Sequence, residues 1–308
     1  MQIVKKVKIS VILPSYNGER YIAQSIQSVI DQTEQDWELI IVNDCSTDST
    51  LKICENFAKQ DSRIKIISNK TNKKLPASLN VGFDAANGKY LTWTSDDNYY
   101  KPDALEKMSN YLDNHQDVDL VSMGFDVIDE NDNFMYYSEN SRRYKRCQES
   151  LICGNNIGAA FMYRKTIADK IGDYDTNTFC AEDYDYWCRI ALAGKIGYSP
   201  DNIYVYRLQS NSLTATKQTQ IQEKTIYIQR KYAKDFFNKF NFSESDKIKF
   251  YINVLHETPD KRKINMNRFL AKYVISLVFW SSKLRHKIKD RLLLKDKFSF
   301  ERLAKEDK

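Results

Sequence analysis

Short apolar stretches alternate with amphipathic helical patterns through the first hundred residues, and this alternation constrains the fold more than any other feature of the sequence. The apolar stretches are "KISVILPS", "WELIIVND", "RIKIIS" and "KYLTWTS". A helical pattern fills each interval, such as "GERYIAQSIQSVIDQ", whose isoleucines and valine recur at helical spacing. Strands that recur about every 25–30 residues with helices between them predict βαβ units and a mainly parallel α/β sheet flanked by helices.

The second hundred residues continue the pattern less regularly. Strands are expected in "VDLVSMGFDVID", "GAAFMYR" and "IYVYRLQSNSLT", with a loop or hairpin over 129–150 and a helix in "AEDYDYWCRIALAG". From residue 217 glycine is absent and Lys, Ile and aromatic residues dominate. We therefore expect an α/β domain over 1–216 and a helical extension over 217–308.

The charge is unevenly divided between these two parts. Residues 217–308 contain 23 Lys and Arg against 11 Asp and Glu, a net of +12, whereas 1–216 carries a net of −6. A basic extension favours an anionic partner. Within it, 268–295 sets the apolar run "VISLVFW" among basic residues, too short to span a bilayer but suited to an interfacial helix on an anionic membrane. Packing on the first domain or on a second copy of the chain is the alternative, and nucleic acid is not expected.

Several absences narrow the location and the class of protein. No signal-peptide pattern opens the chain, no run of about 18 apolar residues occurs, and the six cysteines form no CxxC pair. We expect a cytoplasmic protein with reduced cysteines, with peripheral attachment to the inner face of the cytoplasmic membrane as an option. Without GxGxxG after the first strand or GxxxxGK[ST], dinucleotide binding is poorly supported and a P-loop NTPase is excluded.

Polar and aromatic residues follow the first, second and fourth predicted strands. Because ligands bind at the carboxyl ends of strands in such sheets, Pro14, Tyr16, Asp44 and the pair Asp96–Asp97 are expected at one crevice. A tyrosine ring can lie against a nucleobase, and carboxylates can accept hydrogen bonds from base or ribose. Carboxylates also bind Mg²⁺ or Mn²⁺, which bridge to phosphate oxygens. The set fits a nucleotide-diphosphate site.

A second acidic group opens the helix in "AEDYDYWCRIALAG". Glu182, Asp183 and Asp185 have a structural interpretation, since acidic residues favour helix N-termini through the helix dipole. They also have a functional one, in which a carboxylate is the general base that deprotonates an acceptor hydroxyl.

Five stretches, taken in order, resemble family 2 glycosyltransferases, which are inverting enzymes with the GT-A fold. They are "ISVILPSYNGERYI", "ELIIVNDCSTDST", "ANGKYLTWTSDDNYYKPDAL", "AEDYDYWCRI" and "YRLQSNSLT". The resemblance covers about residues 1–215, and "TSDDNYYKPDAL" is similar to the spore-coat polysaccharide branch of the family. It implies a Rossmann-like GT-A catalytic domain over 1–216.

The resemblance assigns the donor side of the site. It implies that Pro14, Tyr16 and Glu19 lie along the nucleoside, that Asp44 contacts the uracil, and that Asp96 contacts the ribose side of the nucleotide. It implies Asp97 as the main protein ligand of Mn²⁺ or Mg²⁺.

The resemblance also assigns the acceptor side. It implies Asp183 as the catalytic base, with Glu182 and Arg189 in support. Four aromatic residues are candidates to line a sugar-binding cleft, with core packing as the alternative for the last: Tyr99, Tyr100, Tyr186 and Trp187. Arg207 and Gln209 belong to "YRLQ", where many members have Tyr-Arg-x-His.

This sequence departs from the family pattern at the metal site. Thr94 stands where many members have the first aspartate of Asp-x-Asp-Asp, and Gln209 replaces a histidine that in some members reaches the metal or diphosphate. Because an amide is a weaker ligand than imidazole for Mn²⁺, metal binding is expected to depend mainly on Asp97.

The predicted reaction is transfer of a sugar, most commonly from a UDP-sugar, to an acceptor hydroxyl. The family's common acceptor is a surface polysaccharide, such as capsule or lipopolysaccharide, or a lipid-linked glycan. Two other classes remain open. A sugar-nucleotide pyrophosphorylase also uses an α/β sheet and a metal-bound aspartate, and a non-catalytic nucleotide-sugar-binding module would keep the fold alone.

Overall fold

The computed structural model of the chain describes residues 7–138 and 148–244 together with 246, 247, 250 and 254. The chain divides into two compact units, Met1–Phe242 and Ser243–Lys308. All nine described strands lie in the first unit. In the second unit the described residues after Ser243 are helical.

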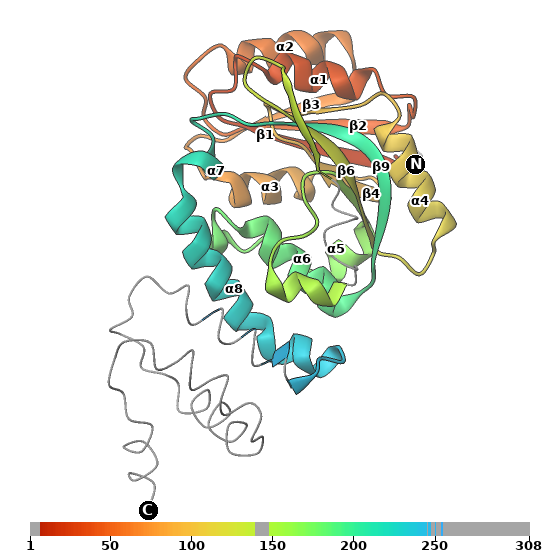
Figure 1. Ribbon diagram of the computed structural model, residues 1–308. Helices are drawn as coiled ribbons and strands as arrows, with labels where there is room; N and C mark the ends of the chain where they lie inside the picture. Colours follow the sequence, from red (N-terminus) through yellow and green to blue (C-terminus); the bar gives the residue numbers. More distant parts are fainter. Residues whose placement is uncertain (1–6, 139–147, 245, 248–249, 251–253, 255–308) are drawn as a thin grey trace, which may run out of the picture. The chain divides into compact units, whose positions relative to one another are not determined.

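The described strands form one mixed sheet (Figure 1). Their bounds are β1 (Ile9–Ser15), β2 (Trp37–Asn43), β3 (Ile64–Ser68), β4 (Tyr90–Trp93), β5 (Tyr99–Tyr100), β6 (Leu120–Ile128), β7 (Phe134–Ser138), β8 (Phe161–Arg164) and β9 (Ile196–Arg207). The order is β3-β2-β1-β4-β8-β6-β9-β5, with β7 paired to β6.

The sheet is parallel in its first half and mixed in its second. Strands β3, β2, β1 and β4 are mutually parallel, as the alternating pattern predicts. Strand β8 then lies antiparallel between β4 and β6, β9 runs parallel to β6, and β5 and β7 are antiparallel additions. The mainly parallel arrangement expected from the sequence therefore holds only for the first half, because β8, β5 and β7 enter the sheet without a βαβ crossover.

Helices cover both faces of this sheet (Figure 1). The α-helices are α1 (Ile22–Ile30), α2 (Thr50–Gln60), α3 (Leu75–Asp84), α4 (Ala104–Asn114), α5 (Lys165–Ile171), α6 (Glu182–Ala193), α7 (Leu213–Thr216) and α8 (Gln218–Lys239). There are also two described 3₁₀ helices, η1 (Gln148–Cys153) before β8 and η2 (Thr176–Thr178) between α5 and α6. Figure 1 shows α1 and α2 on one side of the sheet and α3, α5 and α6 on the other.

The core explains why the first strands are continuously apolar rather than alternating. Every residue of β1 and of β2 is buried, since helices cover both faces of the parallel half. Helix α1 contributes Ile22, Ile26 and Val29, which lie on one helical face and are fully buried. This packing holds the ends of the strands in place and so positions the loops that follow β1, β2 and β4.

Helix α8 is part of the first compact unit, which extends to Phe242. It buries Ile228 and Phe236 and packs along α6 and η1. Helix α8 thus follows residue 216 in sequence but packs on the α/β core. The expected division into independent domains at residue 216 stays a prediction.

Two predictions concern segments that are only partly described. The predicted loop or hairpin over 129–150 is a β6–β7 hairpin followed by η1, with 139–147 outside the described residues. None of the described helices has the length and apolar character needed to cross a bilayer. The predicted interfacial helix over 268–295 lies outside the described residues.

Candidate functional site

The loops after β1 and β4 meet at the carboxyl edge of the parallel strands. Ser15, the last residue of β1, donates a hydrogen bond from Oγ to Asp96 Oδ2 at 2.5 Å. Gly18 lies so close to the same carboxylate that a Cβ atom there would be 2.1 Å from Asp96 Oδ2. The loop after β1 can therefore approach Asp96 only because residue 18 has no side chain.

The loops after β1 and β2 are tied together by short hydrogen bonds. The Asn17 N–H donates to Ser46 Oγ at 3.0 Å, and Glu19 Oε2 accepts from the Ser49 N–H at 2.9 Å. Pro14 is buried within β1, whereas Tyr16, the residue after β1, is 51% exposed. Tyr16 is thus placed to contact a ligand, and Glu19 holds the adjoining loops in register.

Asp44 is buried at the end of β2 and organises the loop after β3. Its Oδ1 accepts from Asn69 Nδ2 and from the Lys73 N–H, both at 2.8 Å, and its Oδ2 accepts from the Lys74 N–H at 2.9 Å. The carboxylate therefore holds the 69–74 loop at the carboxyl ends of β2 and β3. A contact with a nucleobase stays a prediction.

The Asp96–Asp97 pair sits where ionisation is unfavourable. Burial raises the pKa of Asp96 to about 7, opposed by the Ser15 hydrogen bond and reinforced by the charge of Asp97. Burial also raises the pKa of Asp97, against the hydrogen bond from Gln209 Nε2 to Asp97 Oδ2 at 2.5 Å. Two adjacent buried carboxylates favour a proton or a cation close by.

A buried arginine holds the backbone of this turn. Arg207 is 1% exposed, donates from Nε to the Asp97 carbonyl at 3.1 Å, and donates from Nη2 to Asp132 Oδ1 at 2.8 Å. Its backbone N–H donates to Asn98 Oδ1 at 2.8 Å. The role of Arg207 in the structure is to fix the position of Asp97.

The residues at the end of β4 fit a divalent cation. Carboxylate oxygens are the ligands that Mg²⁺ and Mn²⁺ prefer, and a cation would offset the burial that opposes ionisation of Asp96 and Asp97. Thr94 cannot add to such a shell, because its hydroxyl is buried on Tyr204 Oη at 2.6 Å. Among the described residues, no group of three or more His, Cys, Asp or Glu gathers as a ready metal site.

The second acidic pair begins helix α6. Burial raises the pKa of Glu182 to about 8, and the neighbouring charge of Asp183 adds to this effect. Burial also raises the pKa of Asp183, whereas hydrogen bonds from the Tyr184 N–H and from Asn155 lower it. Glu182 Oε2 is buried with no hydrogen-bond partner among the described residues. At neutral pH, the raised pKa of Glu182 therefore favours its protonated form beside Asp183.

Two residues at this site were missed from the sequence. Asn155 Nδ2 donates to Asp183 Oδ2 at 2.8 Å, from a Gly- and Asn-rich turn before β8 that resembles many surface turns. Tyr206 of β9 is partly buried; burial raises its pKa, and the negative charges of Asp97 and Asp183 act in the same direction. Tyr206 therefore lies within electrostatic reach of both acidic pairs.

A buried carboxylate anchors helix α6 to α8. Asp185 is fully buried and accepts from Arg189 Nε, Lys231 Nζ and Tyr232 Oη, each at 2.9 Å. At the other end of α6, Lys239 Nζ donates to the carbonyls of Ala191 and Leu192 at 2.9 Å. Arg189, predicted as a supporting residue, thus acts on the carboxylate two residues after Asp183.

Two aromatic residues considered for the sugar cleft are buried in the core instead. Trp187 is fully buried, and its ring lies edge-on to Phe161 with centroids 4.5 Å apart. Tyr186 stacks on Tyr174 at 3.9 Å. The structure therefore gives Trp187 a packing role.

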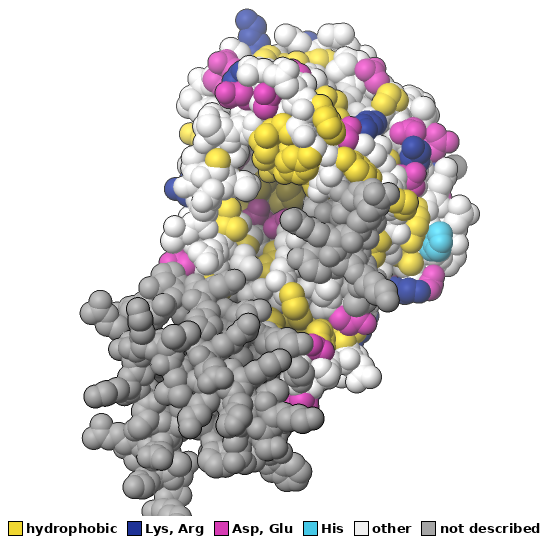
Figure 2. All heavy atoms as spheres, viewed as in Figure 1, with side chains coloured by type: hydrophobic (Ala, Val, Ile, Leu, Met, Phe, Trp, Pro, Cys, Tyr) yellow, Lys and Arg dark blue, Asp and Glu magenta, His cyan; other side chains and the backbone are white. Residues whose placement is uncertain are grey.

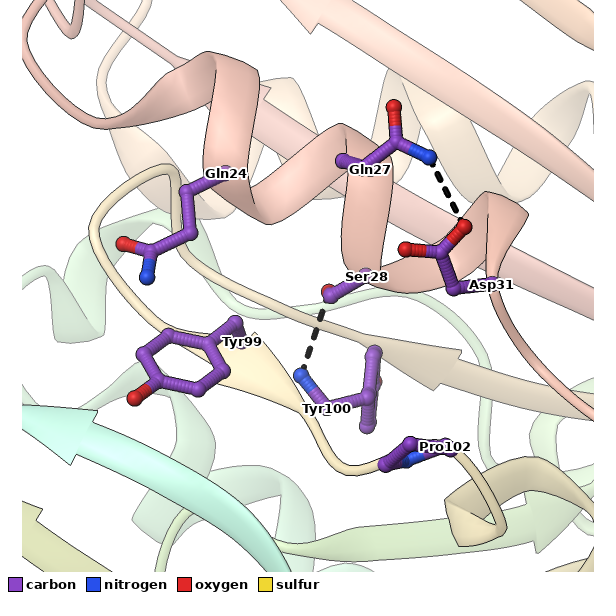
Figure 3. Close-up of a pocket in the computed structure, with 7 residues that line it drawn as sticks. All are labelled: Gln24, Gln27, Ser28, Asp31, Tyr99, Tyr100 and Pro102. Carbon is purple, nitrogen blue, oxygen red and sulfur yellow. Dashed lines mark hydrogen bonds between the residues drawn. The ribbon is translucent and has the colours of Figure 1, made fainter.

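A separate groove of about 290 Å³ lies between α1 and β5. Its lining consists of Gln24, Gln27, Ser28, Asp31, Tyr99, Tyr100 and Pro102 (Figure 3). Gln24 connects it to the acidic turn, since Gln24 Oε1 accepts from Arg207 Nη2 at 2.8 Å.

Comparison with known sequences identifies a family and a relative. A family model described as glycosyl transferase family 2 matches residues 10–172. An uncharacterised glycosyltransferase of Haemophilus influenzae is 31% identical over 245 residues, which cover 75% of each chain.

Comparison with solved structures concerns the fold. S. aureus TarS 1–349 in complex with UDP-GlcNAc is similar with a TM-score of 0.63 and 20% identity, covering 87% of this chain and 79% of that one. In the structure of TarS itself the match spans 47% of that chain. A Pyrobaculum calidifontis mannosyltransferase in complex with GDP-Man and Mn²⁺ has a TM-score of 0.60 and 15% identity, with 92% and 83% covered.

Proposed function

The chain belongs to glycosyl transferase family 2, and from that premise we propose that it is an inverting transferase that uses a nucleotide-diphosphate sugar, in the first instance a UDP-sugar. One observation carries the proposal. One member of each acidic pair, Asp97 of Asp96–Asp97 and Asp183 of Glu182–Asp183, lies within electrostatic reach of the same tyrosine, Tyr206. One pair suits a diphosphate-bound cation and the other suits a general base. The fold neighbours crystallised with UDP-GlcNAc, or with GDP-Man and Mn²⁺, support a donor of this class.

The donor side of the crevice is set by the loops after β1, β2 and β4. Tyr16 offers an exposed ring to the nucleoside, Asp44 shapes the 69–74 loop, and Asp96 faces the ribose side. Asp97 would be the main protein ligand of Mn²⁺ or Mg²⁺, with Gln209 beside it. When bound, such a cation neutralises the charge that grows on the diphosphate leaving group.

On the acceptor side, Asp183 is the general base. Asn155 holds Asp183 Oδ2, which orients the carboxylate. The acceptor oxygen attacks the anomeric carbon on the face opposite the diphosphate, and Asp183 takes the hydroxyl proton. The bond from the anomeric carbon to the diphosphate oxygen breaks, the electron pair leaves with the nucleotide, and the configuration inverts. A raised pKa makes Asp183 a stronger base than an exposed carboxylate.

The biological setting proposed for this reaction is the synthesis of a surface polysaccharide or a glycolipid. The basic residues of 217–308 would bring the enzyme to an anionic membrane surface, where lipid-linked acceptors reside. Deleting residues 268–308 should then abolish sedimentation with anionic vesicles. Equal sedimentation of the full and shortened chains would remove this segment as the anchor.

The donor is tested by thermal shift with a panel of UDP-, dTDP- and GDP-sugars, each with and without Mn²⁺. A ligand at a hundred times its Kd stabilises the native state by about 2.7 kcal/mol, so the true donor should raise Tm by several degrees. No stabilisation by any nucleotide sugar would contradict the proposal. Formation of UTP from the UDP-sugar and pyrophosphate, rather than release of UDP, would favour a pyrophosphorylase instead.

A further inference from the structure

A row of side chains crosses the sheet beside the two acidic pairs. Val127 of β6 is paired with Tyr206 of β9 and with Tyr136 of β7. Because residues directly opposite one another in a sheet project from the same face, the two tyrosines flank Val127 on one surface. Val127 is 2% exposed, Tyr206 is partly buried and Tyr136 is 51% exposed. The row therefore joins the interior of the site to its outer rim.

The inner end of this row lies near one carboxylate of each acidic pair. The charges of Asp97 and Asp183 both act on the Tyr206 hydroxyl, and so does Tyr136. A hydrogen bond with Thr214 holds that hydroxyl from the side of α7. The ring also packs on Phe125, with centroids 6.0 Å apart, so it is held on the floor of the site rather than free in solvent.

The outer end of the row is unusually exposed for apolar residues. Phe134, Met135 and Tyr136 follow one another in β7 with 64%, 51% and 51% exposure. Figure 2 shows hydrophobic side chains gathered beside a hollow in which acidic side chains lie. Only Tyr136 of these three belongs to the row, because Phe134 is paired with Ile128, which projects from the face opposite to Val127. An exposed tyrosine at the rim of a site is placed to contact a ligand.

We propose that Tyr136 and Tyr206 form the acceptor-binding surface and that the acceptor presents a neutral sugar ring to them. This inference rests on the proposed transferase function and adds the chemistry of its second substrate. A phenol ring offers a flat apolar face to the C–H face of a pyranose and a hydroxyl to its polar rim. No Lys, Arg, Asp or Glu belongs to the row, so nothing in it selects a charged acceptor.

A sugar ring fits this row better than a lipid chain. The only aliphatic member, Val127, is buried and cannot contact a ligand, whereas both accessible members are tyrosines. Of the four aromatic residues that the sequence suggested for a sugar cleft, Tyr100, Tyr186 and Trp187 are 3%, 3% and 0% exposed and cannot serve. The fourth, Tyr99, lines the separate groove beside α1. The acceptor surface accordingly falls to β7 and β9.

The test is NMR of the full chain carrying ¹³C-labelled tyrosine rings, with UDP and Mn²⁺ present. Methyl pyranosides of glucose, galactose, mannose and N-acetylglucosamine are the probes. Tyr136, Tyr206 and Tyr227 are assigned by single Tyr→Phe substitutions. At least one pyranoside should shift the Tyr136 and Tyr206 signals saturably and leave Tyr227, an equally exposed tyrosine of α8 at 50%, unmoved.

Substitution should then weaken this binding selectively. Tyr136→Ala should raise the apparent Kd of that pyranoside about 3- to 10-fold, the range expected for one aromatic contact, while Tyr136→Trp restores it. Tyr227→Ala is the matched control and should leave the Kd unchanged. A melting curve like that of the wild type confirms that Tyr136→Ala is folded.

Three outcomes would overturn the proposal: no pyranoside shifts Tyr136, Tyr136→Ala binds as the wild type does, or octyl phosphate below its micelle concentration shifts Tyr136 when no pyranoside does. The last outcome would assign the surface to a lipid chain.

Binding of UDP, dTDP and GDP with Mn²⁺ is measured on the same samples. If neither UDP, dTDP nor GDP binds, the proposed function itself is contradicted, whereas nucleotide binding without a Tyr136 response contradicts the acceptor surface alone.

Discussion

Carboxyl groups on adjacent residues of this chain have different hydrogen-bond partners. Asp96 accepts from Ser15 and Asp97 from Gln209, and Asp183 is held by Asn155 while Glu182 Oε2 has no partner among the described residues. Burial is the dominant cause of the raised pKa at each of the four carboxyl groups. Local hydrogen bonds then decide which carboxyl of each pair ionises more readily.

Glu182→Gln tests the protonation of the second pair through stability. The pKa of Glu182 is raised from 4.5 to about 8 by burial, so between these values the native state keeps a proton that the unfolded chain has lost. Stability of the wild type should therefore fall as pH rises from about 4.5 to about 8 and then level off. The glutamine variant should lose this component of the slope.

Urea unfolding at half-unit pH steps measures this effect. One pKa unit corresponds to about 1.4 kcal/mol, so the component should amount to at most a few kcal/mol. Parallel pH profiles for the wild type and Glu182→Gln would contradict a protonated Glu182.

Asp97→Ala tests the donor side of the site. Because Asp97 is proposed as the main protein ligand of the cation, its loss should weaken UDP binding in the presence of Mn²⁺ at least tenfold, about 1.4 kcal/mol by calorimetry. Asp169→Ala removes an exposed carboxylate of α5 and serves as control. Metal-dependent UDP binding at wild-type strength in Asp97→Ala would exclude the assignment.

Sequence reasoning located the acidic residues but not their partners. Asp44, Asp96 and Asp97 follow strands whose ends a parallel sheet brings together, so their convergence was predictable. Asn155 and Tyr206 were not, because an asparagine in a turn and a tyrosine in a strand are common for structural reasons alone. Gln209 was expected to leave the metal shell incomplete; in the structure it binds Asp97 directly.

At the scale of elements, the position of the proposed base, Asp183, depends on a helix outside the predicted catalytic domain. Asp185 lies two residues after Asp183 on α6 and binds Lys231 and Tyr232 of α8. Partial burial lowers the pKa of Lys231, but the hydrogen bond to Asp185 outweighs this effect and raises the pKa above its usual value. The composition change at residue 217 is real, yet it does not mark the end of the structure that supports the site.

Lys231→Met tests this link between elements. The substitution leaves Asp185 fully buried, with Arg189 and Tyr232 as its remaining partners. The free energy of unfolding should therefore fall by about 1–3 kcal/mol. This is less than for a fully buried pair, because the side chain of Lys231 is 32% exposed. Lys234→Met, on the exposed side of the same helix, should change stability by less than about 0.5 kcal/mol. Chemical unfolding distinguishes the two, and equal effects would show that the Asp185 link contributes nothing specific.

The second half of the sheet shows what periodicity misses at this scale. Strand β5 has only two residues, Tyr99 and Tyr100, and is too short to produce a pattern. Its antiparallel pairing with β9 carries the chain from the Asp96–Asp97 turn past Arg207, which fixes that turn. The antiparallel insertion of β8 likewise depends on long-range packing that a local pattern does not record.

At the scale of the whole molecule, the GT-A α/β fold predicted from the sequence is confirmed by the likeness to TarS and to the mannosyltransferase. In this fold Tyr206 of β9 lies within electrostatic reach of both Asp97 and Asp183. The family is shown, whereas the donor, the acceptor and the metal are proposals. The sugar cannot be predicted because its recognition depends on loop side chains that follow no repeating pattern.

The central claim is that Asp183 is the base of a sugar transfer, and Asp183→Asn tests it most directly. The rate of transfer from the donor found by thermal shift is measured for the wild type and the variant, together with the affinity of each for UDP and Mn²⁺. The account predicts that transfer falls by about 100-fold or more while UDP affinity stays within about twofold. Transfer at the wild-type rate by Asp183→Asn would contradict it.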